Sequence, residues 1–245
     1  PTGSGKTTTL YTTLKQLATP EVNVCTIEDP IEMIEGAFNQ MQVQSNIDLT
    51  FASGVRALMR QDPDIIMVGE IRDLETAEMA IQAALTGHLV FSTLHTIDAA
   101  AAVTRLIDLG VAPYLISATV IGVLAQRLVR TLCPLCKQVD EPVSGETLSE
   151  FIKPWRLNGQ FRPYKPVGCL DCRMTGFKGR VGLYELLPVS EAVRDTLHPQ
   201  VDMAQLRKTA AKEGLRPLRL SGIMKVTEGI TTVDEVLRNT PQWDR

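Results

Sequence analysis

The first residues of the chain have the composition of a loop that binds phosphate. They are Thr2, Gly3, Ser4, Gly5, Lys6, Thr7 and Thr8. Glycines let backbone N–H groups turn towards phosphate oxygens, the lysine reaches the outer phosphates of a nucleotide, and the next hydroxyl can ligate Mg²⁺. Short stretches of Gly, Ser and Lys also occur as plain loops, but this one precedes a predicted helix ending near Leu17. We therefore expect ATP to bind here.

The first glycine of the complete motif would stand just before Pro1, which predicts that the chain is a fragment.

Two acidic residues, Glu32 and Glu70, are candidates for the hydrolytic chemistry. Glu32 follows a strand predicted over Glu21 to Ile27, and Glu70 follows the apolar run Ile65 to Val68. In a parallel sheet ligands bind at the carboxyl ends of the strands, where one carboxylate can orient Mg²⁺ and another can accept a proton from water. Acids also cluster in exposed loops without any such role. Gly69 departs from the Asp that usually precedes the acid at this point.

His88 and His95 flank a strand predicted over Leu89 to Leu94. Because they are seven residues apart, a regular strand would direct them to opposite faces. His95 follows the strand, on the side expected to hold nucleotide, so it could contact the γ-phosphate or a neighbouring subunit. We expect His88 to be structural.

Four cysteines form two C-x-x-C pairs with the spacing of a metal site. They are Cys133, Cys136, Cys169 and Cys172, with 32 residues between the pairs (169 - 136 - 1 = 32). This pattern predicts a structural Zn²⁺ site that stabilises a segment poor in hydrophobic residues. Disulfides or a redox dithiol are the alternatives. The fifth, Cys25, stands within a predicted strand and is expected to be a buried apolar residue.

The segments that position these residues alternate between strands and helices as far as Arg130. Asp73 and Asp98 are predicted helix N-caps, and Pro113 fits the first turn of a further helix. The pattern predicts an α/β fold with a parallel sheet between helices. The run from Tyr114 to Ala125 is interpreted as a buried helix. We expect three parts: a nucleotide-binding core over residues 1–131, a tetracysteine zinc lobe over 132–182 and a helical lobe over 183–245.

The composition is that of a globular protein. Hydrophobic residues make up 44% and charged residues 22% of the 245 residues, and the formal net charge is -3. Basic residues are scattered rather than clustered, which argues against a nucleic-acid partner. The longest nearly apolar run is too short to span a bilayer.

Several motifs resemble those of the type II secretion and type IV pilus assembly ATPases. The matching segments are Thr26-Ile-Glu-Asp-Pro-Ile-Glu32, Arg60 to Asp73, Thr86 to Thr96, Ala125 to Pro134, Gly179 to Leu187 and Glu228 to Leu237. The resemblance covers nearly the whole chain. It implies a RecA-like P-loop NTPase core, with Glu32 as the proposed catalytic glutamate, Glu70 as the Walker B acid and His95 as the residue near the nucleotide.

The same resemblance implies a homo-oligomeric motor, expected to be a hexamer, on the cytoplasmic face of the bacterial inner membrane. Its expected partners are an inner-membrane platform protein and a cytoplasmic linker protein, and no nucleic acid is expected. The tetracysteine insertion favours the assembly or secretion branch over the retraction ATPases. Ile97 stands where the family usually has Asn, and the family's arginine fingers come from a region before Pro1. A nucleic-acid translocase or a nucleotide-binding scaffold without turnover are the alternative functions.

Overall fold

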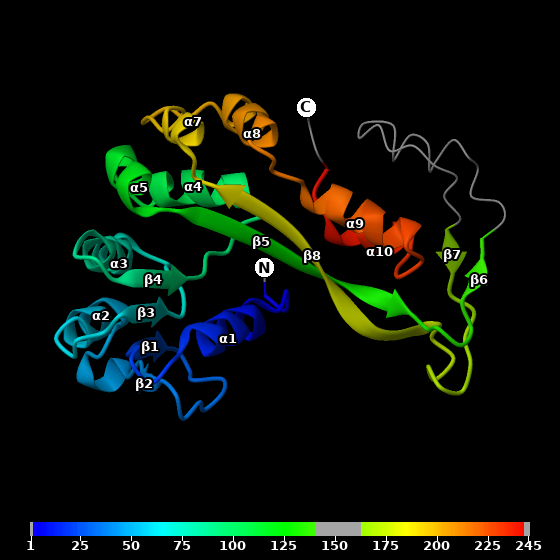
Figure 1. The fold of residues 1–245 in the computed structure, drawn as a ribbon, viewed down its shortest axis with the longest axis horizontal. Helices are drawn as coiled ribbons and strands as arrows, with labels where there is room; N and C mark the ends of the chain where they lie inside the picture. Colours follow the sequence, from blue (N-terminus) through cyan, green and yellow to red (C-terminus); the bar gives the residue numbers. More distant parts are fainter. Residues whose placement is uncertain (1, 141–162, 243–245) are drawn as a thin grey trace.

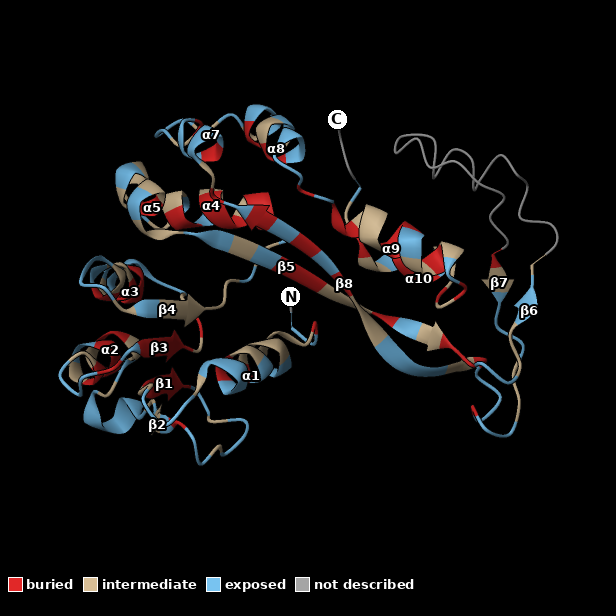
Figure 2. Cartoon of the chain, in the orientation of Figure 1, coloured by how far each residue is buried: buried red, intermediate tan, exposed pale blue. Residues whose placement is uncertain are grey.

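A parallel sheet forms the amino-terminal part of the structure. In the computed structural model, which describes residues 2–140 and 163–242, this sheet has four strands in the order β2-β1-β3-β4 (Figure 1). The strands are β1 (Val24–Glu28), β2 (Asn39–Gln42), β3 (Ile65–Val68) and β4 (Leu89–Ser92). Every residue of β1 and β3 is buried (Figure 2). This arrangement confirms the predicted α/β class and the strand at Ile65 to Val68.

Helices cover both faces of this sheet. The amino-terminal helices are α1 (Lys6–Leu17), α2 (Phe51–Leu58), α3 (Leu74–Leu85), α4 (Ala99–Asp108) and α5 (Pro113–Thr119), and a 3₁₀ turn spans Ser45–Ile47. On one face Cys25 and Ile66 pack in a cluster with α2 and α3. On the other face Val24 and Met67 pack with Leu14 of α1. Consecutive residues such as Val24 and Cys25 pack on opposite faces because the side chains of a strand alternate with a two-residue period.

The helix starts lie where the sequence predicts them. The Asp73 carboxylate accepts a hydrogen bond from the Thr76 N–H at 2.8 Å, and Asp98 accepts one from the Ala101 N–H at 2.7 Å. Pro113 stands in the first turn of α5. The two Asp carboxylates satisfy N–H groups that a helix end leaves without intrahelical partners, and Pro113 has no N–H to satisfy.

The prediction of a buried helix from Tyr114 to Ala125 is wrong. Helix α5 ends at Thr119 and strand β5 (Gly122–Leu132) begins three residues later. The β-branched residues Val120 and Ile121 followed by Gly122 disfavour a continuing helix. Tyr114 and Ile121 are each 71% exposed.

Strand β5 pairs antiparallel with β8 (Phe177–Pro188) to form a long ribbon. Helices α4, α9 (Leu218–Thr227) and α10 (Val233–Asn239) contact one side of it, and the parallel sheet with α1 lies on the other (Figure 1). The short helices α7 (Glu191–Arg194) and α8 (Met203–Lys212) pack beyond α4.

The ribbon joins parts of the chain that the sequence analysis separates. The expected boundaries after residues 131 and 182 fall inside β5 and β8, so both strands contribute to two of the expected lobes. The division into three lobes stays a prediction, and residues 141–162 of the expected zinc lobe lie outside the described residues. Strands β6 (Gln138–Val139) and β7 (Tyr164–Lys165) pair next to that segment. No helix within residues 2–140 and 163–242 is long and apolar enough to cross a membrane.

Glu185 of β8 connects the ribbon to two helices. Its side chain is 1% exposed, and its two carboxylate oxygens accept hydrogen bonds from the Ala99 N–H at 2.9 Å and the Leu218 N–H at 3.0 Å. These are the first residues of α4 and α9. A carboxylate at a helix N-terminus is favoured by the helix dipole as well as by the N–H donors.

We predict that Glu185→Gln lowers the free energy of unfolding by about 1–3 kcal/mol, because the amide N–H₂ then faces a backbone N–H donor and leaves it unsatisfied. Chemical denaturation of the variant and the wild type measures this difference. Glu213→Gln is the control, because Glu213 is exposed at the end of α8. Equal stability of the two variants would contradict the bridging role of Glu185.

Candidate functional site: a phosphate loop and a tetracysteine cluster

The phosphate loop leads directly into α1. Gly3 and Gly5 have φ angles of 74° and 81°, a region that side chains disfavour, so glycine suits both positions. The first turn of α1 has no side-chain cap and no acidic residue. Its N–H groups and the positive end of the helix dipole are therefore available to an anion. The buried hydroxyl of Ser4 has no hydrogen-bond partner among the described residues.

Lys6 lies among charged groups from three other segments. Burial lowers its pKa and Arg127 lowers it further, whereas the carboxylates of Glu70 and Glu32 raise it. The structure therefore brings the predicted lysine within electrostatic range of both predicted acids. Arg127 was not among the candidates from the sequence.

Glu70 contacts two charged or titratable side chains. It is buried directly after β3, and one carboxylate oxygen lies 3.3 Å from Nε2 of His95. The other oxygen is paired with Arg72, which sequence reasoning missed. The pattern Glu70-Ile71-Arg72 was the available signal, because residues two apart in extended chain share a side. His95 and Glu70 therefore lie together after the neighbouring strands β4 and β3.

Gly69 precedes Glu70 because the backbone approaches β1 closely at this point. A Cβ atom at Gly69 would lie 3.2 Å from the Ile27 carbonyl oxygen and 3.4 Å from the Glu28 Cα. An Asp at this position would make these backbone contacts tighter than usual, so that the neighbouring atoms of β1 would have to give slightly. The departure from the usual motif therefore has a packing reason.

Glu32 lies in an exposed loop after β1, and a buried network holds the base of that loop. The hydroxyl of Tyr11 in α1 lies 2.8 and 2.9 Å from the Glu28 carboxylate oxygens and 2.9 Å from the Met33 carbonyl oxygen. The Gln40 side chain donates to the Tyr11 hydroxyl at 2.8 Å. Burial raises the pKa of Tyr11, so the phenol stays protonated. Sequence reasoning missed this anchor because its residues are far apart in the chain.

His88 is placed as a structural residue. Its Nδ1 lies 2.9 Å from the Ala83 carbonyl oxygen at the end of α3, and 3.1 Å from the Thr86 hydroxyl. The His88 ring thus contacts a carbonyl group in the last turn of α3.

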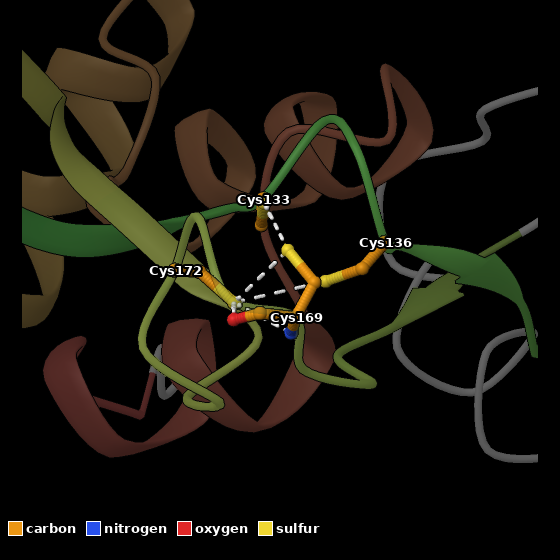
Figure 3. Close-up of side chains that lie close together, drawn as sticks. All are labelled: Cys133, Cys136, Cys169 and Cys172. Atoms are coloured by element: carbon orange, nitrogen blue, oxygen red, sulfur yellow. Dashed lines mark hydrogen bonds between the residues drawn. The ribbon is translucent and has the colours of Figure 1, made fainter.

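The four cysteines form one compact cluster (Figure 3). Their sulfur atoms all lie within 4.8 Å of one another. The sulfur atoms of Cys133 and Cys169 are 3.8 Å apart, as are those of Cys136 and Cys172. Four thiolates bound tetrahedrally to zinc at about 2.3 Å would be separated by about 3.8 Å. A disulfide would need about 2.0 Å. The donor set therefore fits zinc.

Backbone groups stabilise negative charge on the cluster. The Sγ atom of Cys172 accepts hydrogen bonds from the N–H groups of Cys169 and Gly176, both at 3.2 Å. Although burial raises its pKa, these bonds bring the pKa of Cys172 to about 6. Burial raises the pKa of Cys136 to about 11. A bound cation would favour the thiolate form of all four ligands.

Comparison with known proteins places the whole arrangement in a family. The family model described as type II/IV secretion system protein matches residues 1–238. The chain belongs to this family. It is 58% identical over 241 residues to the type IV pilus assembly ATPase TfpB of Acinetobacter baylyi, covering 98% of this chain and 41% of that protein. It is 48% identical over 242 residues to the type II secretion system ATPase E of Vibrio cholerae, covering 99% of this chain and 47% of that protein.

Two solved ATPase structures have a fold similar to that of this chain. The pilus retraction motor PilT with bound ADP matches 99% of this chain and 60% of its own chain, with a TM-score of 0.71 and 28% identity. The ATPase DotB of Legionella pneumophila matches 97% of this chain and 57% of its own, with a TM-score of 0.70 and 29% identity. These likenesses confirm the predicted P-loop ATPase fold. The chain spans less than half the length of the two curated relatives described above.

We predict that the protein binds one zinc ion per chain and that Cys136→Ser lowers both its zinc content and its stability, because three thiolates hold the ion less tightly than four. Elemental analysis and thermal unfolding of the same samples measure the two effects. Cys25→Ser is the control for zinc content, since Cys25 lies in β1, away from the cluster. Full retention of stability in the presence of a chelator would contradict a structural zinc site.

Proposed function

We propose that this chain is the ATP-hydrolysing part of a motor subunit that powers type IV pilus assembly or type II protein secretion. The observation that carries the proposal is that Lys6, Glu70 and His95 lie close together at one end of the parallel sheet. The Glu70 carboxylate acts electrostatically on Lys6 and lies 3.3 Å from His95. An uncapped helix N-terminus binds phosphate, and an acid beside it can act on water. The names of the relatives support the same activity.

In this proposal each part of the site has one role. The backbone N–H groups from Gly3 to Thr8 and the Lys6 ammonium hold the β- and γ-phosphates of ATP, and Thr7 offers its hydroxyl to Mg²⁺. The Mg²⁺ ion held there would supply positive charge to the β- and γ-phosphate oxygens. Glu70 orients Mg²⁺ through water, and Glu32 accepts the proton of the attacking water. His95 stands beside Glu70, within reach of the γ-phosphate.

Zinc has a separate, structural role in the proposal. Cys133, Cys136, Cys169 and Cys172 would hold the ion with no ligand position left open, so it takes no part in hydrolysis. The ion would join the end of β5 to the start of β8, because one cysteine pair follows β5 and the other precedes β8.

The proposed assembly is a homo-oligomer, a hexamer, as the similarity to secretion and pilus ATPases supports. The ring would sit against the cytoplasmic face of a bacterial inner membrane, with a membrane platform protein and a cytoplasmic linker protein as partners. Similarity to assembly and secretion ATPases at 48–58% identity, against 28% with the retraction motor PilT, supports the assembly or secretion branch. The names of these relatives give no support to a nucleic-acid partner.

We predict that Glu70→Gln in the full-length protein lowers the ATP turnover number by at least about a hundredfold and leaves ATP affinity within about twofold, because the neutral amide keeps the shape of the side chain but orients Mg²⁺ less well than a carboxylate. Phosphate release and nucleotide binding are measured on the same preparation. Glu75→Gln is the control, because Glu75 is exposed in the first turn of α3.

Two results would count against this proposal. Unchanged turnover in Glu70→Gln would show that the assignment of this acid is wrong. ATP binding without turnover in the wild type, at concentrations that allow ring assembly, would favour the scaffold function instead.

A further inference from the structure

One polar side chain of the ribbon is buried on the side that faces the phosphate loop. Tyr184 and Leu124, on the same side of the ribbon as Gln126, are each 47% exposed, whereas Gln126 of β5 is 7% exposed. The loop itself covers it, since a Cβ atom on Gly5 would lie 2.8 Å from Nε2 of Gln126. A buried amide is costly unless its donors and acceptors are paired.

Gln126 is paired at both ends, and both partners belong to the phosphate-binding segment. Its Nε2 donates to the Ser4 carbonyl oxygen at 2.7 Å. Its Oε1 accepts from the Thr9 hydroxyl at 2.7 Å. The two partners stand on either side of the turn from the loop into α1, so one rigid amide fixes the loop relative to the helix. Only one orientation of the amide satisfies both bonds.

The bond to Ser4 also determines which way the next N–H points. In a trans peptide the carbonyl and the N–H of the same unit point in opposite directions. Because the Ser4 carbonyl is directed at β5, the Gly5 N–H is directed away from β5. A phosphate-binding concavity is formed when successive N–H groups of a loop face the same side. The contact from β5 therefore sets the direction of the Gly5 N–H, a hydrogen-bond donor for phosphate, before any ligand is present.

We propose that Gln126 is a positioning residue for the phosphate loop, and that it raises the affinity for the phosphates of ATP or ADP by holding the Ser4–Gly5 peptide and Thr9 in place. The inference rests on the proposed nucleotide site. It assigns a role in that site to β5, a strand more than a hundred residues away in the sequence. A residue that merely packed β5 against α1 would contribute to stability without coupling to nucleotide affinity.

The test is a double-mutant cycle in the full-length protein, with Gln126→Met, Thr9→Val and the pair. Nucleotide dissociation constants are measured for ATP and ADP. Each single change is expected to weaken binding about fivefold to tenfold, the effect of about one net hydrogen bond. The pair is expected to weaken binding little more than Gln126→Met alone, because that change already removes the contact between Gln126 and Thr9.

Thr13→Val is the matched control. Thr13 lies one turn further along α1 and its hydroxyl donates to the Thr9 carbonyl oxygen, so the change removes the same kind of group without touching Gln126. The dissociation constant of Thr13→Val is expected to be within about twofold of the wild-type value. The effects of Thr13→Val and Gln126→Met in the double variant are expected to be additive. Thermal unfolding and zinc content of every variant are recorded, so that loss of fold is recognised.

The outcomes separate this inference from the proposed function. A wild type that binds no ATP overturns the proposed function and the inference with it. Tight binding by the wild type and equally tight binding by Gln126→Met overturns the inference alone, and so do additive effects of Gln126→Met and Thr9→Val. If Gln126→Met fails to fold, the comparison of Thr9→Val with Thr13→Val decides, and equal affinities of these two overturn the inference.

Discussion

The carboxylate of Glu185 bonds to the first N–H groups of α4 and α9, and it is buried where a charge is unfavourable unless it is paired. Burial raises its pKa, while the two N–H donors oppose that effect. Asp98, the N-cap of α4, is paired with Arg207 of α8 at 2.7 Å. The helices of the carboxyl-terminal part are thus attached to α4 through polar contacts whose loss would leave buried groups unsatisfied. The bonds of Glu185 fix β8 against α4, and pairing with β8 then fixes β5 against the nucleotide-binding part.

With β5 fixed, consecutive residues of that strand reach opposite sides of the ribbon. Gln126 contacts the phosphate loop, and Arg127 donates a hydrogen bond to the Ile97 carbonyl in the segment after His95. Because the acceptor is a backbone carbonyl, the contact does not depend on the side chain at position 97. An Ile at position 97, where the resemblance leads us to expect Asn, therefore keeps this bond. Both sides of the proposed ATP site are held by one strand.

Local signals in the sequence predicted the parts of this structure that depend on neighbouring residues. Asp73 and Asp98 cap helices because the bonds they form span three residues, and Ile65 to Val68 is a buried strand because every residue of it is apolar. The cysteine cluster was predictable because two C-x-x-C pairs have the spacing typical of a zinc site. The β5–β8 pairing was not, since its partners are as much as 66 residues apart (188 - 122 = 66) and the amino-terminal end of β5 continues the apolar run of α5. The contacts of Gln126 and Tyr11 depend on that tertiary arrangement, so sequence reasoning missed them.

The charge of Lys6 relates the packing around the phosphate loop to phosphate binding. Burial and the neighbouring Arg127 lower its pKa, and the carboxylates of Glu70 and Glu32 oppose this. Phosphate groups would act on Lys6 in the same direction as the carboxylates and at closer range, so phosphate binding and protonation of Lys6 favour each other. Glu70 is also engaged by Arg72 and His95, which keeps it from neutralising Lys6 completely. The site therefore retains positive character at the start of α1, where the helix dipole adds to it. An anion is the ligand that this arrangement favours, and its phosphates would meet N–H groups already oriented by β5.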